Sequence, residues 1–129
     1  MEKTCKIILL LLCNFASVFL FSQNHPQVFN FDKNDYGASS KNWSIASDNR
    51  GIIYIGNHQG LLQYDGHNWN LYRMPAGGVV RSVFVDNSRI YTGTYEEFGY
   101  WEPDETGLLH YVSLSSQLKN FTFHNQEIW

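Results

Sequence analysis

The chain has 129 residues, of which 43% are hydrophobic, 16% aromatic and 16% charged, with a formal net charge of −3. This length allows one small domain or part of a larger one, and the hydrophobic share excludes a disordered chain. Both cysteines lie in the first 22 residues, so the remainder has no disulfide framework, no cysteine-ligated zinc site and no cysteine nucleophile. Seven basic against eleven acidic residues in that remainder exclude the clustered positive charge of a nucleic-acid-binding surface.

Residues 1–22 have the layout of a secretory signal peptide. Lys3 and Lys6 precede an apolar run of about 15 residues, and the chain turns polar at Ser22. As a helix this run would measure roughly 22 Å, which is shorter than a ~30 Å hydrocarbon core. We therefore expect export, with cleavage between Ser22 and Gln23; an uncleaved membrane anchor is the alternative.

Two similar stretches, residues 42–69 and 80–111, follow a lead-in segment at residues 23–41. The Asp-Asn pair at 48–49 matches the pair at 86–87, residues 53–56 match 90–93, and Gly60 matches Gly99, at offsets of 37 to 39 residues. A third copy begins near residue 125. Its last two residues, Ile-Trp, are predicted to stand where Trp-Ser and Arg-Ser open the first two copies.

Each copy consists of short β-branched and aromatic runs separated by turn residues. Four such strands in about 40 residues are typical of a β-propeller blade. We therefore predict an all-β fold, a β-propeller with about two four-stranded blades present of a larger ring; a repeating up-and-down sandwich is the alternative. The expected parts are blade 1 at residues 42–79, blade 2 at 80–124 and the start of blade 3 at 125–129. Because two blades cannot close a ring, we expect the chain to be the amino-terminal part of a longer protein.

Several residues have structural roles in this prediction. Gly56 and Gly93 are expected to end the second strand where another segment passes close or where φ turns positive. Asp48 and Asp86 are expected to accept backbone N–H groups in turns. Four aromatic residues are expected to pack between adjacent blades: Tyr54, Trp69, Tyr72 and Tyr91.

The residue pattern of the repeat is specific. From residue 48 to 66 the chain reads Asp-Asn-x-Gly-x-x-Tyr-x-Gly-Asn-x-x-Gly-Leu-Leu-x-Tyr-Asp-Gly, which resembles the two-component-regulator propeller repeat. The second copy departs from this pattern, since residues 95–100 replace the usual short turn. Residues 28–54 and the later DGHNW, VRSV, EEFGYW and YVSLS motifs are similar to the first blades of exported sensor proteins of the Bacteroidetes phylum.

This resemblance implies a sensor at the periplasmic face of the inner membrane. Such proteins carry a propeller, a triple-tyrosine domain, one membrane span and a cytoplasmic output, which is a LuxR-type helix-turn-helix or a histidine kinase. The expected partners are the rest of the propeller, the triple-tyrosine domain and a second copy of the full-length protein.

No motif in the chain carries catalytic chemistry. The sequence contains no HExxH zinc motif, no GxSxG nucleophile elbow and no glycine-rich phosphate loop, so we expect no cofactor, no metal and no catalytic residue in this segment. A secreted propeller lyase or glycosidase, which would need a site spanning blades outside this chain, and a surface adhesion propeller are the alternatives.

A binding mouth is predicted instead. The loop before the innermost strand of a blade and the loop between its second and third strands open at the same end of a propeller. Aromatic faces beside polar groups suit a carbohydrate or another small ligand; in the alternative, the tryptophans plug the central channel. The predicted mouth residues are Trp43, His58, Arg81, Tyr95, Glu96 and Trp129.

The first testable prediction concerns the leader. Amino-terminal sequencing of the exported protein is expected to begin at Gln23, because Ser22 supplies the small residue that precedes a cleavage site. Mature protein that retains Met1 would contradict the prediction.

Overall fold

The computed structural model describes residues 26–129, so the predicted leader and its cleavage point lie outside the described residues. The chain divides into two compact units, residues 1–30 and 31–129. In the first unit, residues 26–30 are exposed and form no helix or strand. Within residues 26–129, no helix is long and apolar enough to cross a bilayer.

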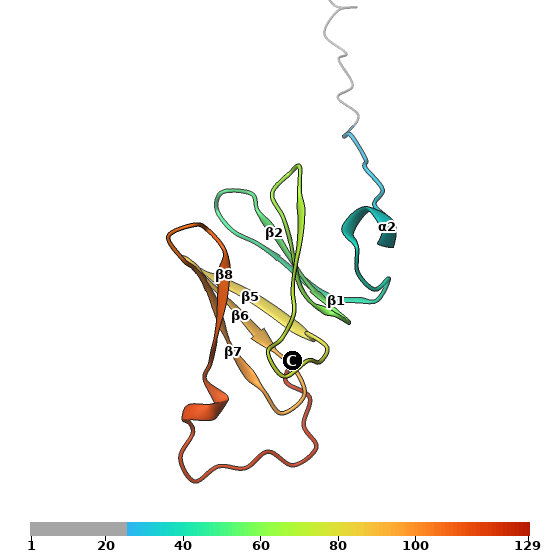
Figure 1. Ribbon diagram of the computed structural model, residues 1–129. Helices are drawn as coiled ribbons and strands as arrows, with labels where there is room; N and C mark the ends of the chain where they lie inside the picture. Colours follow the sequence, from blue (N-terminus) through green and yellow to red (C-terminus); the bar gives the residue numbers. More distant parts are fainter. Residues whose placement is uncertain (1–25) are drawn as a thin grey trace, which may run out of the picture. The chain divides into compact units, whose positions relative to one another are not determined.

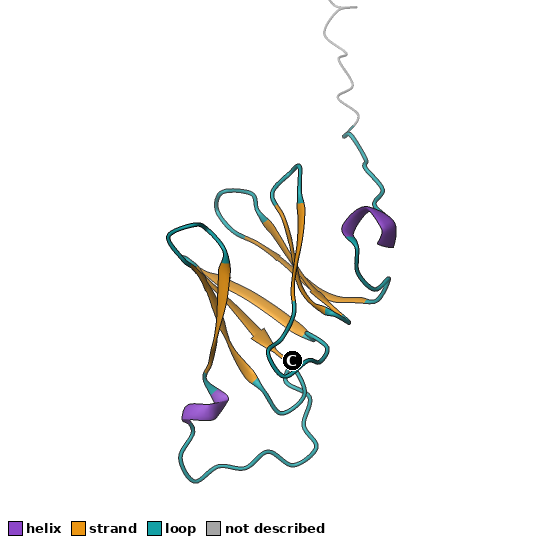
Figure 2. Cartoon of the chain, viewed as in Figure 1, coloured by secondary structure: helices purple, strands orange, loops and turns teal. Residues whose placement is uncertain are grey.

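Residues 31–129 contain two four-stranded antiparallel sheets, each with its strands in chain order (Figures 1 and 2). The first sheet contains β1 (Asn42–Ser47), β2 (Ile53–Asn57), β3 (Gly60–Tyr64) and β4 (Trp69–Tyr72). The second contains β5 (Ser82–Asp86), β6 (Arg89–Gly93), β7 (Phe98–Pro103) and β8 (Leu109–Ser113). The all-β prediction with two four-stranded blades is confirmed.

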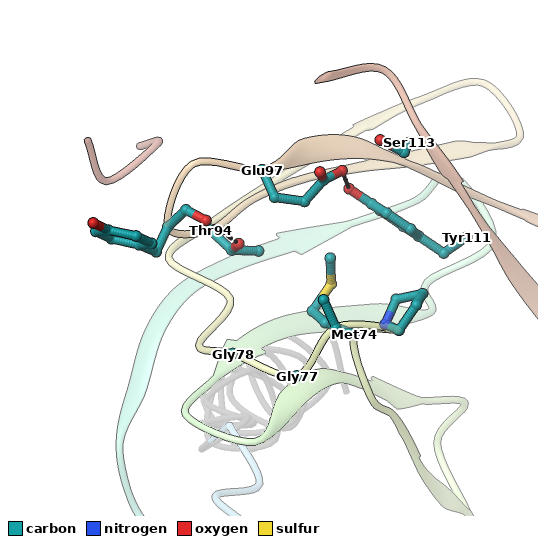
Figure 3. A pocket seen from close by; sticks show the side chains of 10 residues that line it. Met74, Gly77, Gly78, Thr94, Glu97, Tyr111 and Ser113 are labelled. Atoms are coloured by element: carbon teal, nitrogen blue, oxygen red, sulfur yellow. Dashed lines mark hydrogen bonds between the residues drawn. The ribbon is translucent and has the colours of Figure 1, made fainter. Parts of the chain in front are cut away.

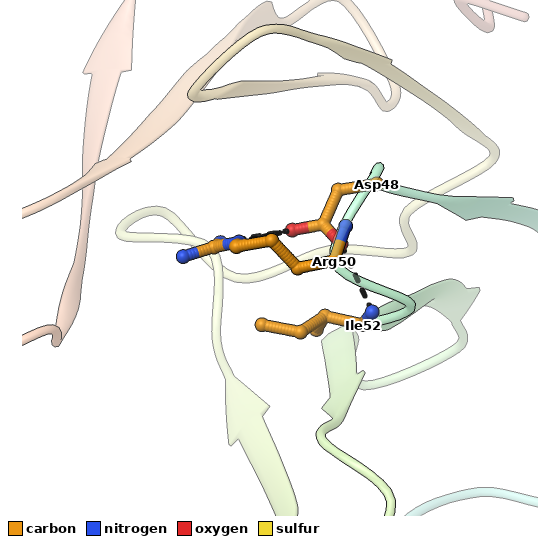
Figure 4. A network of polar contacts seen from close by, with 3 residues as sticks. All are labelled: Asp48, Arg50 and Ile52. Atoms are coloured by element: carbon orange, nitrogen blue, oxygen red, sulfur yellow. Dashed lines mark hydrogen bonds and ion pairs between the residues drawn. The ribbon is translucent and has the colours of Figure 1, made fainter.

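The β1–β2 turn depends on one carboxylate (Figure 4). Asp48 Oδ1 accepts the backbone N–H groups of Arg50 and Ile52, both at 2.9 Å, and Oδ2 lies 2.8 Å from the Arg50 guanidinium. Burial raises the pKa of Asp48, but the bonds to Arg50 and to the two amides together bring that pKa below its ordinary value. The predicted role of Asp48 is confirmed.

The β5–β6 turn is built differently. The carboxylate of Asp86 accepts the side-chain amide of Asn87 at 3.0 Å, and no backbone N–H bonds to it among the described residues, so that prediction is wrong. Asn87 itself adopts φ 53°, which Asn tolerates better than most residues. This turn is one residue shorter than the first, and Asn87 takes the left-handed conformation that Gly51 supplies there.

The two sheets pack face to face around a shared core. Tyr54, Leu61 and Val80 meet Ile90 and Trp101, all at most 3% exposed. The indole Nε1–H of Trp101 donates to the Thr92 hydroxyl at 3.0 Å within this core, so its one polar group is satisfied.

Side chains at corresponding positions of the two sheets point in the same direction along the stack of sheets. Ile90 pairs with Trp101 as Ile53 pairs with Tyr64, yet Ile90 and Trp101 face the other sheet whereas Tyr64 lies on an outer face. Each sheet therefore presents one face suited to a preceding sheet and one suited to a following sheet, as propeller blades do.

The four aromatic residues expected between blades divide accordingly. Tyr54 and Tyr72 contact the second sheet, and the Tyr72 ring lies 5.9 Å from that of Trp101. Trp69 and Tyr91 instead lie on the outer faces of the first and second sheets. The Trp69 ring stacks on that of Tyr64, and the Tyr91 ring lies 5.9 Å from that of Tyr100 in a tilted arrangement.

The lead-in segment contains a short helix, α2 (Lys33–Tyr36), which the sequence analysis did not predict. A capping box of Asp32 and Asp35 begins it, and Gly37 ends it at φ 63°. Phe31 and Tyr36 bring their rings within 5.5 Å of Trp69, so the lead-in covers part of the first sheet's outer face. A 3₁₀ turn, η1 (Ser115–Gln117), follows β8.

Gly56 and Gly93 lie where the second strand of each sheet closely approaches the backbone of the segment that opens the next repeat. A Cβ on Gly56 would come within 2.9 Å of the Val80 carbonyl oxygen, and one on Gly93 within 2.5 Å of the Ile128 carbonyl oxygen. The predicted close approach is confirmed. Ile128 occupies the position in the third copy that Val80 occupies in the second, so Trp129 corresponds to Arg81. The predicted register of the third copy is therefore off by one residue.

The second testable prediction compares two tryptophans. Trp101→Phe leaves the buried Thr92 hydroxyl without its donor, which should cost about 1–3 kcal/mol in addition to the lost apolar contact. Trp69→Phe should cost less, because Trp69 Nε1 is buried with no hydrogen-bond partner among the described residues. Circular dichroism during urea titration measures the loss in free energy of unfolding for both variants. Equal losses would contradict the role assigned to the bond between Trp101 and Thr92.

Candidate functional site

Four segments meet at one end of the two sheets, which we call the loop end: residues 57–60, 73–81, 94–97 and 114–129. Backbone bonds join them, since the Val80 N–H donates to the Asn57 carbonyl at 3.1 Å and the Ile128 N–H donates to the Thr94 carbonyl at 2.8 Å. The repeated bond pattern shows that both connections leave their sheets in the same way.

An aromatic and arginine cluster lies at this end. The Arg81 guanidinium carbon lies 4.0 Å from the centre of the Trp43 ring and 5.6 Å from that of Trp129. The two indoles are 6.3 Å apart and nearly perpendicular. The structure therefore brings together three of the six predicted mouth residues, and these three occupy corresponding positions in successive repeats.

Glu127 completes the cluster, although the sequence reading did not single it out. Its two carboxylate oxygens each lie 3.1 Å from a nitrogen of Arg81, a bidentate pair in which the Arg81 side chain is 17% exposed. A cation held over an indole face and paired with a carboxylate has a fixed position.

Tyr95 and Glu96 contact the chain near its carboxyl end. Tyr95 forms an isolated antiparallel bridge with Glu127, and its hydroxyl donates to Asn125 Oδ1 at 2.5 Å. Glu96 adopts φ 53°, and its carboxylate accepts the Asn125 N–H at 2.6 Å. Both side chains therefore fasten residues 125–127 beside the cluster.

His58 stands apart from these residues. Its backbone N–H donates to the Lys41 carbonyl at 3.0 Å, while its exposed ring makes no hydrogen bond or ion pair with any of residues 26–129. It lies in the loop that corresponds to Tyr95, but the structure does not join it to the cluster.

A pocket of about 560 Å³ opens beside the cluster (Figure 3). The connection between the sheets, residues 74–78, forms one wall, and the β6–β7 loop with β8 forms the other. The Tyr111 hydroxyl donates to Glu97 Oε1 at 2.7 Å, and the Ser115 hydroxyl donates to Glu97 Oε2. Neither Glu97 nor Tyr111 is among the six mouth residues predicted from the sequence.

The pocket follows from a difference between the two repeats. Gly60 pairs with Asn57 around a two-residue loop, and the Thr94 N–H bond to the Glu97 carbonyl closes a loop of the same length. Glu97, and not Gly99, therefore corresponds to Gly60, and the β6–β7 turn is as short as its counterpart. The predicted match of Gly60 with Gly99 is therefore wrong, and so is the prediction that residues 95–100 replace the short turn.

The substitution changes the local packing. A Cβ on Gly60 would collide with the carbonyl of Tyr72, so the chain passes tightly over this position in the first sheet. In the second sheet Glu97 carries a side chain at that position, and its carboxylate instead holds the Ser115 hydroxyl after β8. A glutamate at the glycine position of the repeat was the signal available in the sequence.

Two tyrosines that line the pocket have raised pKa values. Burial raises the pKa of Tyr111 well above its ordinary value, and the bond to Glu97 and the charge of Glu97 raise it further. Burial, followed by the charge and hydrogen bond of Glu96 and the charge of Glu127, likewise raises the pKa of Tyr95. Both phenols therefore keep their protons and act as hydrogen-bond donors.

Among residues 26–129, no three His, Cys, Asp or Glu side chains lie close enough to share a metal ion. No protein-family model, no curated protein and no solved structure matches the chain.

The third testable prediction concerns Arg81. Arg81→Met keeps the length of the side chain but removes the pair with Glu127 and the charge over Trp43, so residues 125–128 should loosen. Amide hydrogen exchange at Glu96 and Ile128 should accelerate roughly 5- to 20-fold, as expected for losing one partly exposed ion pair and one cation–π contact.

The matched control is Arg89→Met. Arg89 also lies over a ring, 4.2 Å from the centre of Tyr100, and pairs with Glu102 at 3.4 Å, but it contacts none of residues 125–128. Unchanged exchange in Arg81→Met, or equal acceleration in both variants, would show that Arg81 does not fasten this segment.

Proposed function

We propose that the chain supplies the opening blades of the ligand-binding propeller of an exported sensor, and that its aromatic and arginine cluster binds a carbohydrate. The observation that carries this proposal is the convergence of Trp43, Arg81 and Trp129 from three successive repeats on one point at the loop end. Both indoles keep exposed surface, 41% of Trp43 and 71% of Trp129.

The chemistry of the cluster favours a sugar. The apolar face of a pyranose stacks on an indole, while its hydroxyl groups need donors and acceptors at the rim. Arg81 supplies donors, and the Glu127 carboxylate beside it supplies acceptors. Because the ion pair already neutralises the guanidinium, a neutral polyhydroxylated ligand fits better than an anion.

The two outer sheet faces support further blades in the complete sensor. Phe84, 66% exposed, and Tyr91 lie on the outer face of the second sheet, and Ile45, 69% exposed, lies on that of the first. These positions correspond to residues that meet between the two described sheets. Further four-stranded sheets of the same kind would cover them.

The sensor part of the proposal rests on the sequence. The leader pattern supports export, and the resemblance of residues 48–66 to the two-component-regulator propeller repeat supports a transmembrane regulator with a cytoplasmic output. Ligand binding at the loop end would then bias the arrangement of downstream domains.

The fourth testable prediction uses a glycan array of neutral oligosaccharides, followed by calorimetric titration of the best binder. Trp43→Ala should weaken binding roughly 5- to 100-fold, by analogy with the 1–3 kcal/mol that base stacking on an aromatic side chain contributes. Its thermal midpoint should fall less than that of Trp69→Ala, since Trp69 packs against Phe31, Tyr36 and Tyr64.

The opposite pattern would overturn the proposal. If Trp43→Ala loses as much stability as Trp69→Ala while the remaining folded protein binds the oligosaccharide normally, Trp43 fills the channel and binds nothing. Absence of binding to every glycan on the array would remove carbohydrate as the ligand class.

A further inference from the structure

Glu97 is the one charged side chain that lines the pocket between residues 74–78 and β8. Ion pairs elsewhere in residues 26–129 involve the carboxylates of Asp48, Glu102, Asp104 and Glu127, and Glu97 belongs to none of them. Only neutral hydroxyl groups, from Tyr111 and Ser115, bond to it. The pocket therefore holds a negative charge without a counter-cation from the described protein.

The carboxylate retains capacity for a ligand. Two carboxylate oxygens offer about four acceptor positions, and the two hydroxyl bonds use two of them. The Thr94 side chain also lines the pocket; the residue is 3% exposed, and its hydroxyl makes only a long bond of 3.4 Å to the Tyr95 carbonyl. A buried hydroxyl with so weak a partner is available as a second polar contact.

Apolar groups form much of the remaining wall. Met74, which is 4% exposed, lies opposite the ring of Tyr111 in Figure 3, and Pro75 also lines the pocket. A volume of about 560 Å³ falls within the roughly 300–1,000 Å³ of small-molecule sites. Such walls suit a compact hydrocarbon or ring body.

We propose that this pocket binds an organic cation, specifically a primary ammonium group carried on a compact apolar body. The ammonium group donates to Glu97 and to the Thr94 hydroxyl, while the body packs against Met74 and Tyr111. The raised pKa of Tyr111, to which burial contributes first and the bond and charge of Glu97 next, agrees with a negative charge at this place in the pocket. The inference does not rest on the proposed carbohydrate site, because it uses none of Trp43, Arg81 and Trp129.

The test uses two probes of the same shape, cyclohexylmethylamine and cyclohexylmethanol. The unprocessed chain, with its predicted leader still attached, contains two methionines, Met1 and Met74. Methionine methyl labelling of this chain therefore gives two nuclear magnetic resonance signals, which Met74→Leu assigns. The amine should shift the Met74 signal saturably and leave the Met1 signal unchanged. The alcohol should bind at least about tenfold more weakly, because a charge-assisted hydrogen bond is roughly twice as strong as a neutral one.

Two variants locate the charge that is recognised. Glu97→Gln should weaken amine binding at least about tenfold and leave alcohol binding unchanged. Glu105→Gln, which removes the same charge from an exposed turn, should change neither. The comparison of the two probes on the unmodified chain decides the question even if Glu97→Gln proves unstable.

Three results would overturn the proposal. They are equal binding of the two probes, a shift of the Met1 signal in place of the Met74 signal, and no saturable shift of the Met74 signal up to the solubility limit of the amine. Loss of oligosaccharide binding in Trp43→Ala would leave this proposal intact, so the two sites can fail independently.

Discussion

The close approach of backbone to backbone at Gly56 and Gly93 is the constraint on which the rest of the structure depends. At each glycine the strand lies against the residue that leads into the next repeat, Val80 in one case and Ile128 in the other. No side chain can occupy that space without displacing a carbonyl group. The glycine therefore fixes where each new repeat begins relative to the one before, and it places Arg81 beside Trp43 and Trp129 beside Arg81.

The stacking of the two sheets follows from the same repetition. Once successive repeats start from corresponding points, corresponding residues face in the same sense, so the Ile90 and Trp101 pair in the second sheet meets Tyr54 and Leu61 in the first. Trp101 can occupy this core because Thr92 accepts its indole N–H. On the outer face of the second sheet Phe84 is exposed, whereas Phe31 and Tyr36 of the lead-in cover part of the outer face of the first sheet.

Much of this arrangement could be predicted from the sequence, because alternation of apolar residues, turn residues and the repeat of Tyr-x-Gly are local signals. The strands, the glycine contacts and the convergence of Trp43 with Arg81 are of this kind. The short helix α2 was not, since four residues carry no periodicity, and only its capping box distinguishes it. The alignment of Gly60 with Gly99 failed for another reason. It matched two residues of the same type and ignored the length of the loop between the strands. The register is decided by hydrogen bonds between strands, which the sequence does not show.

That misalignment concealed the most distinctive chemistry in the chain. A position that is glycine in one repeat and glutamate in the next cannot keep the same packing, because the glycine is chosen for the absence of a side chain. With Glu97 in place, the carboxylate accepts hydrogen bonds from the hydroxyl groups of Tyr111 and Ser115. A charge held among neutral donors and apolar walls stabilises a fold poorly unless something neutralises it. The departure from the repeat is therefore better explained by a bound cation than by stability.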